Sequence, residues 1–196
     1  MMKNPIFDQA FWSEKYQSNK MGWDLGMVSP PIKAYIDQLT NKKLSILIPG
    51  AGNAYEAAYL FEQGFEDVTI LDLAKEPLDN FRDRVPEFPT EQLIQQDFFK
   101  HKGQYDLIIE QTFFCALDPS LRMDYIHKMK ALLKSGGKLV GLLFDFRLSE
   151  NGPPFGGDAD AYSLAFEKEF KLTTLAPCYN SIKPRLGNEL FIIFER

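Results

Sequence analysis

Four runs of almost uninterrupted apolar residues recur along the chain, and each is followed by a polar or turn-forming residue. A strand that is covered on both faces has this pattern, whereas a half-exposed strand alternates apolar and polar positions. The runs predict buried strands of a parallel sheet over residues 44–48, 68–71, 105–110 and 138–144. Weaker apolar segments predict three further strands over residues 92–95, 171–176 and 189–194.

Segments with helical spacing separate most of these strands, which is typical of a doubly wound α/β fold with a mostly parallel seven-stranded sheet. The last two strands are joined by a loop alone, which predicts an antiparallel C-terminal hairpin strand at the edge of the sheet. We expect one domain over residues 1–196, in which residues 1–30 form an aromatic-rich lead-in. The predicted helices cover residues 30–38, 54–62, 75–84, 117–133 and 159–168.

The turn after the first strand has the residues of a nucleotide-type site. Gly50 and Gly52 let a backbone approach a ligand closely, and the following helix start offers free N–H groups. Asp72 ends the second strand, where a carboxylate can accept hydrogen bonds from ribose hydroxyls. A dinucleotide site requires a third glycine where Tyr55 stands, so the pattern favours S-adenosylmethionine. A structural glycine turn without a ligand is the alternative interpretation.

Charge and composition narrow the classes of partner. The 196 residues carry a net charge of −5, which argues against a surface for phosphate backbones and hence against a nucleic-acid partner. The sequence shows neither a signal peptide nor an apolar stretch long enough to span a membrane, so we expect a cytoplasmic protein without membrane contact. The two cysteines and two histidines lack metal-ligand spacing, so no metal is expected. A monomer is favoured.

Several segments together resemble one family. They are the lead-in FWSEKYQSNKMGWDLG, the turn PGAG, TFFCAL followed by DPSLR, and the loop NGPPFG. With them, residues 11–196 resemble the thiopurine methyltransferase superfamily, above all its plant-type halide/thiol methyltransferase branch. The resemblance implies a Rossmann-like methyltransferase fold with an N-terminal aromatic lid and S-adenosylmethionine as the cofactor.

The resemblance also implies which residues bind the cofactor. Three lead-in aromatics would line the site, where their faces can stabilise a sulfonium, although Tyr16 stands where a tryptophan is usual. Residues at the strand ends would contact the ribose, the adenine and the methionine portion. The implied cofactor-binding residues are Trp12, Tyr16, Trp23, Gly50, Gly52, Asp72, Asp97, Phe98 and Gln111.

Methyl transfer from a sulfonium requires a nucleophile held in line with the leaving sulfur and protected from water. We expect an apolar acceptor pocket with two arginines to attract an anion, and Asp145 as a base or a group that orients water. His101 and His127 are expected at the surface, and Cys115 in the core. The candidate pocket residues are Phe113, Phe114, Pro154, Phe155 and Arg185, and the candidate catalytic residues are Asp145 and Arg147.

The leading hypothesis is an enzyme that methylates the sulfur of a small thiol or a similar soft nucleophile. A halide ion methyltransferase is the close alternative, and a non-catalytic S-adenosylmethionine-binding protein is an alternative of another class. Asn53, Glu56 and Gln111 depart from the family pattern, so the resemblance defines the cofactor more closely than the acceptor.

Overall fold

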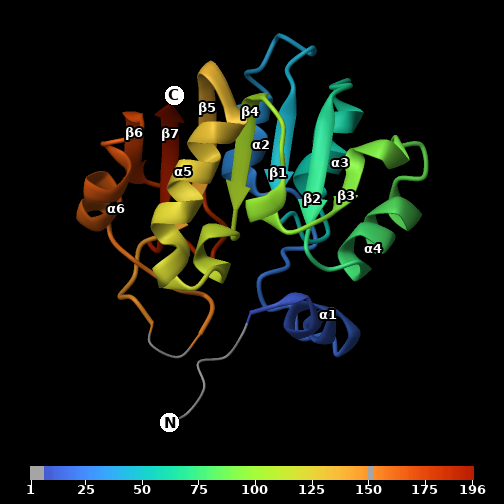
Figure 1. Ribbon diagram of the computed structural model, residues 1–196, viewed down its shortest axis with the longest axis horizontal. Coiled ribbons are helices and arrows are strands. Elements are labelled where there is room, and N and C mark those ends of the chain that lie inside the picture. Colours follow the sequence, from blue (N-terminus) through green and yellow to red (C-terminus); the bar gives the residue numbers. More distant parts are fainter. Residues whose placement is uncertain (1–6, 150–151) are drawn as a thin grey trace.

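The computed structural model describes residues 7–149 and 152–196 as a three-layer α/β domain built on one seven-stranded sheet (Figure 1). The strand order is β3-β2-β1-β4-β5-β7-β6, and only β7 runs antiparallel to its neighbours β5 and β6. The predicted fold class is thereby confirmed. The strands are β1 (Ile46–Pro49), β2 (Val68–Asp72), β3 (Leu93–Gln95), β4 (Tyr105–Gln111), β5 (Leu133–Phe144), β6 (Lys171–Pro177) and β7 (Glu189–Glu195).

Two apolar clusters cover the two faces of the sheet. One cluster is completed by α5 and α6, and the other by α2, α3 and α4. The central strands contribute side chains to both clusters, which explains their uninterrupted apolar sequence. The α-helices are α1 (Gln9–Gln17), α2 (Pro30–Ile36), α3 (Tyr55–Glu62), α4 (Glu76–Arg84), α5 (Arg122–Leu132) and α6 (Ala159–Phe166).

Two boundaries differ from the sequence prediction for local reasons. The helix predicted from residue 117 begins as a 3₁₀ turn over Pro119–Leu121, because the Asp118 carboxylate accepts a hydrogen bond from the Ser120 N–H. The strand predicted from residue 138 begins at Leu133, and its register against β4 shifts before Lys138. The irregular part contains Gly136, which has a positive φ of 73°.

The lead-in contains a helix that the sequence prediction missed. The Asp8 carboxylate caps α1 by accepting a hydrogen bond from the Phe11 N–H at 3.0 Å. Ser13 and Gln17 then donate to the two carboxylate oxygens of Glu76, at 2.8 and 2.7 Å. Glu76 is the first residue of α4, so these bonds hold α1 beside the carboxyl ends of the parallel strands (Figure 1).

His101 is not at the surface, contrary to the prediction. Its side chain is buried, and its ring nitrogens lie 2.7 Å from the Tyr105 hydroxyl and 3.1 Å from the Gln96 amide oxygen. Burial lowers the pKa of the imidazole, so a neutral structural role fits the contacts. His127 is exposed on α5, as predicted, and Cys115 is buried, as predicted.

A buried carboxylate fixes the chain where β4 ends. Glu110 is inaccessible to solvent and accepts hydrogen bonds from the N–H groups of Phe113 and Phe114, at 2.8 and 3.0 Å. The Tyr125 hydroxyl on α5 donates to its other oxygen. Loss of solvation raises the pKa of Glu110 from 4.5 to about 7. The turn that follows β4 is therefore held by one side chain and anchored to a helix.

We expect Glu110→Ala to reduce the free energy of unfolding by at least about 3 kcal/mol, because it leaves two buried donors and one partly buried donor without an acceptor. Glu110→Gln should cost less, since its amide oxygen can still accept from the two backbone N–H groups. Urea denaturation of both variants measures the difference. Equal losses in the two variants would contradict the assigned hydrogen bonds.

The difference in stability between the wild-type protein and Glu110→Gln should depend on pH. The pKa of Glu110 is higher in the folded protein than in the unfolded chain, so protonation favours folding. Its stabilising contribution is complete below about pH 4.5 and is lost as the pH rises through about 7. Relative to Glu110→Gln, the wild-type protein should therefore lose stability between about pH 5 and 7. A difference that stays constant over this range would contradict the raised pKa.

Candidate active site

In the turn after β1, every second residue from Gly50 to Ala54 has a left-handed backbone conformation. Gly50, Gly52 and Ala54 have positive φ values of 56°, 54° and 52°. A side chain at Gly50 would overlap the ring of Phe113, since its Cβ would lie 2.1 Å from a ring carbon. The Phe113 ring alone therefore requires a glycine at this position, whether or not a ligand also approaches it.

Asp72 joins this turn to the end of β2. Its Oδ2 accepts from the Gly52 N–H and its Oδ1 from the Ala74 N–H, both at 2.9 Å. The side chain is buried, which raises its pKa from 3.8 to about 6 despite the two hydrogen bonds. Each carboxylate oxygen has a second lone pair for a further donor, as the predicted ribose contact requires.

The three predicted lead-in aromatics lie together beside the glycine turn. The rings of Trp12 and Trp23 meet edge to face at 5.5 Å, and those of Tyr16 and Trp23 at 5.7 Å. The Tyr16 hydroxyl lies 3.2 Å and the Trp23 indole nitrogen 3.8 Å from the place of a Cβ on Gly52. The structure thus brings these aromatics to the turn that the sequence associated with them.

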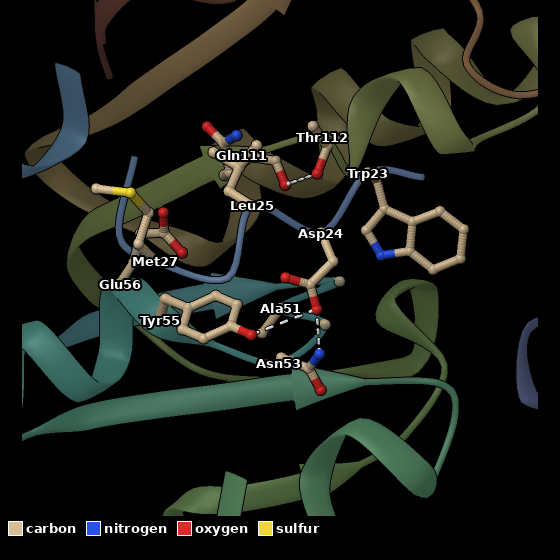
Figure 2. Close-up of a pocket in the computed structure, with 12 residues that line it drawn as sticks. Trp23, Asp24, Leu25, Met27, Ala51, Asn53, Tyr55, Glu56, Gln111 and Thr112 are labelled. Atoms are coloured by element: carbon tan, nitrogen blue, oxygen red, sulfur yellow. Dashed lines mark hydrogen bonds between the residues drawn. The ribbon is translucent and has the colours of Figure 1, made fainter. Parts of the chain in front are cut away.

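A pocket opens between the lead-in and the carboxyl ends of β1 and β4 (Figure 2). Asp24 reaches across it, and the Asn53 amide and the Tyr55 hydroxyl donate to its carboxylate. Two carboxylates in the lining favour a cationic ligand group. The lining residues are Trp23, Asp24, Leu25, Met27, Gly50, Ala51, Gly52, Asn53, Tyr55, Glu56, Gln111 and Thr112.

Gln111 and Thr112 form the opposite wall of the pocket (Figure 2). The amide oxygen of Gln111 is buried and has no hydrogen-bond partner within residues 7–149 and 152–196. Thr112 has a positive φ of 58°, which is costly for a β-branched residue, and its hydroxyl donates to the Gln111 carbonyl at 2.7 Å. A strained backbone beside an unpaired acceptor is typical of a binding site.

The predicted adenine-side residues lie at the end of β3. The Asp97 carboxylate accepts from the Phe99 N–H at 2.9 Å and forms an exposed ion pair with Lys100 at 3.8 Å. Phe98 is buried, and its ring meets that of Phe113 edge to face at 5.0 Å. The Phe113 ring therefore contacts both Phe98, after β3, and Gly50, after β1.

The predicted acceptor and catalytic residues are distributed around the pocket and do not line it. Phe114 lies in a core cluster, and Phe155 is buried with its N–H donating to the Cys115 carbonyl at 2.7 Å. Pro154 and Arg147 are exposed, whereas Asp145 is half-buried at the end of β5. Their proposed roles in the acceptor pocket remain predictions.

Arg122 is a candidate functional residue that the sequence reasoning missed. Its guanidinium lies 4.8 Å from the centre of the Phe114 ring and donates to the Gly156 carbonyl at 2.6 Å. Its Nε is buried without a hydrogen-bond partner, and no carboxylate in the described part of the chain forms an ion pair with it. The sequence prediction placed it inside a helix over residues 117–133, whereas the structure places it first in α5, where the helix dipole disfavours positive charge.

Arg185 has a different environment from the predicted one. Its side chain is 10% exposed, forms an ion pair with Glu189 at 3.4 Å and donates through Nη2 to the Trp23 carbonyl at 2.7 Å. The guanidinium also lies 5.5 Å from the centre of the Phe144 ring. It therefore contacts the lead-in backbone directly.

The sheet order, the glycine turn and the pocket beyond the strand ends define a Rossmann-like methyltransferase fold. The 1,6-didemethyltoxoflavin-N1-methyltransferase of Burkholderia thailandensis, solved with bound S-adenosylhomocysteine, shares it with a TM-score of 0.79 at 16% identity. That comparison covers 100% of this chain and 93% of the other. A sequence profile of the thiopurine S-methyltransferase family matches residues 7–190, so the chain belongs to this family.

Two relatives are also named as methyltransferases. The probable thiol methyltransferase 2 of Arabidopsis thaliana is 26% identical over 184 residues, which are 91% of this chain and 81% of the relative. Thiocyanate methyltransferase 1 of Brassica oleracea is 24% identical over 189 residues, which are 93% and 83% of the two chains. The protein is an S-adenosylmethionine-dependent methyltransferase, as the sequence predicted.

The residues of the pocket fit this cofactor. The unpaired Gln111 oxygen and the carboxylates of Asp24 and Glu56 are acceptors suited to an ammonium group, and Asp72 is suited to hydroxyl donors. Within residues 7–149 and 152–196, no group of three or more His, Cys, Asp or Glu side chains is arranged to hold a metal ion. None of the described helices is long and apolar enough to cross a bilayer.

We expect Asp72→Asn to weaken the binding of S-adenosylhomocysteine about tenfold to a hundredfold, because a hydrogen bond to a charged group contributes about 1.5–3 kcal/mol. The wild-type affinity should also fall as the pH is lowered from 7 to 5, since the carboxylate with a pKa of about 6 becomes protonated. The Asn variant should show no such loss. Calorimetric titration at several pH values measures both effects.

Asp83→Asn, an exposed change on the neighbouring helix α4, is the matched control and should bind as the wild type does. Wild-type affinity in Asp72→Asn would exclude Asp72 as the ribose acceptor. A parallel loss of affinity at low pH in Asp72→Asn would place the titrating group elsewhere.

Proposed function

We propose that this enzyme methylates the sulfur of a small thiol or a similar soft nucleophile. The family is named for thiopurine S-methylation, and the two relatives are named for a thiol and for thiocyanate, which all contain sulfur. The observation that carries the proposal is Arg122, a half-buried cation without a carboxylate partner among the described residues. Such a cation stabilises an anionic nucleophile such as a thiolate.

The residues of the site support a mechanism based on positioning. When bound, S-adenosylmethionine supplies a methyl group on a positively charged sulfur. Asp72, Gln111 and Asp24 would hold that cofactor through its hydroxyl and ammonium groups. The aromatic rings of the lead-in would exclude water from the reacting atoms, which strengthens electrostatic interactions in the site.

A thiolate requires no general base at the moment of transfer. Both histidines, the usual general bases, lie away from the pocket. His127 is exposed on α5, 3.7 Å from Glu169, and His101 contacts Tyr105 and Gln96. Neither histidine lines the pocket. Arg122 would lower the pKa of the bound thiol and so favour the thiolate form of the acceptor. A cytoplasmic location, a monomeric state and the absence of a nucleic-acid partner stay predictions.

A panel of acceptors tests the proposal. We expect thiophenol, hydrosulfide, thiocyanate or a thiopurine to be methylated with a kcat/KM well above that of iodide, measured by the formation of S-adenosylhomocysteine. Asp72→Asn is assayed with saturating cofactor as a control, which tests whether the turnover takes place at this site. Efficient methylation of iodide alone would favour the halide alternative, and no turnover with any acceptor would contradict the proposal.

We expect Arg122→Met to reduce kcat/KM for a thiol about tenfold to a hundredfold, because the thiolate loses a charge-assisted contact. The binding of S-adenosylhomocysteine should stay within about twofold of the wild type, since Arg122 does not line the cofactor pocket. The rate should also rise at a higher pH in the variant, because the bound thiol would then ionise less readily. Arg122→Lys, which keeps the charge, should retain more activity. An unchanged pH profile in Arg122→Met would exclude this role.

A further inference from the structure

The guanidinium of Arg185 connects two segments that are 162 residues apart. The loop that carries it is fixed by backbone hydrogen bonds: the Arg185 N–H donates to the Ile182 carbonyl, and the Asn188 N–H donates to the Arg185 carbonyl, both at 2.9 Å. The Asn188 carbonyl in turn accepts from the Asp145 N–H at the end of β5. The side chain therefore projects from a part of the molecule that is secured to the sheet.

The atom that Arg185 contacts belongs to the backbone of the lead-in. Its Nη2 donates to the Trp23 carbonyl at 2.7 Å, while Nη1 lies 3.4 Å from the Glu189 carboxylate. Glu189 is 3% exposed, so the ion pair lies where salt and water screen it little. The two bonds use different arms of the guanidinium, and the ion pair thus orients the arm that reaches Trp23.

We infer that Arg185 is a positioning residue that holds the Trp23 segment over the cofactor pocket. The residue after Trp23 has an anchor of its own, because Asn53 of the glycine turn and Tyr55 at the start of α3 donate to the Asp24 carboxylate (Figure 2). Trp23 therefore lies between two anchors, one on the loop before β7 and one on the turn after β1. This inference rests on cofactor binding by the enzyme and does not depend on which acceptor is methylated.

The anchoring role differs from two others that the same residue could have. An arginine that attracts an anionic acceptor would affect the KM of the acceptor and leave the ligand-free lead-in unchanged. An arginine that only neutralises Glu189 would affect stability, and that effect would disappear when both members of the pair are replaced. The anchor alone predicts a looser lead-in and weaker cofactor binding after the pair has been removed.

The test uses the double variant Arg185→Met/Glu189→Met, which removes the buried pair together and avoids an isolated buried charge. Both tryptophans of the chain, Trp12 and Trp23, lie in the lead-in, so tryptophan fluorescence reports on this segment alone. We expect stronger quenching by acrylamide without any ligand and an S-adenosylhomocysteine Kd raised about tenfold or more, as for the loss of a hydrogen bond to a charged group. Lys183→Met, which removes an exposed charge from the same loop, should match the wild type in both measurements.

Arg185→Lys is a second variant, which keeps a charge beside Glu189 but lacks the second donor arm. It should show the same two effects in a protein with a wild-type denaturation midpoint. Wild-type quenching together with wild-type affinity, in either folded variant, would overturn the inference. Because both measurements are made without an acceptor, they remain informative even if no acceptor in the panel is methylated.

Discussion

The Asp72 carboxylate holds two neighbouring strand ends in one arrangement. It accepts from Gly52 on the turn after β1 and from Ala74 on the segment that leads to α4. Retaining a carboxylate with so little access to water costs free energy, because the loss of solvation disfavours its charged form and raises its pKa. The cost is offset because the two bonds fix the glycine turn. This turn positions the pocket and the lead-in aromatics.

Buried acidic groups recur at this end of the sheet. Glu56 is buried and accepts from the Ser29 N–H at 3.0 Å, where the lead-in passes into α2, and burial raises its pKa. Glu110 has the same function after β4, where it holds the turn that carries Phe113. Asp72 and Glu110 bind backbone N–H groups where the chain leaves the sheet, and Glu56 binds one where the lead-in joins α2. Function requires irregular backbone here, and the carboxylates supply the hydrogen bonds that helices and strands provide elsewhere.

The sequence predicted the sheet well, because strands covered on both faces must be apolar at every position. It also predicted that Gly50, Asp72 and Gln111 meet at one edge, since parallel strands place their ends together. Contacts between distant segments could not be predicted in this way. The bond between Arg185 and Trp23 depends on the exact paths of two loops, and the burial of His101 depends on Tyr105 and Gln96. The need for glycine at position 50 was predicted, but its cause, the ring of Phe113, became visible only in three dimensions.

The order of the last two strands has a consequence for the synthesis of the chain. β6 is the outermost strand and pairs with β7 alone, yet β7 follows it in the sequence and lies between β6 and β5. As the polypeptide leaves the ribosome, β6 therefore emerges before its partner exists and cannot join the sheet. Until β7 has been translated, β5 also presents an open edge, which is a place where unfinished chains can associate. Pairing with β7 closes the β5 edge and gives β6 its place in the sheet in a single step.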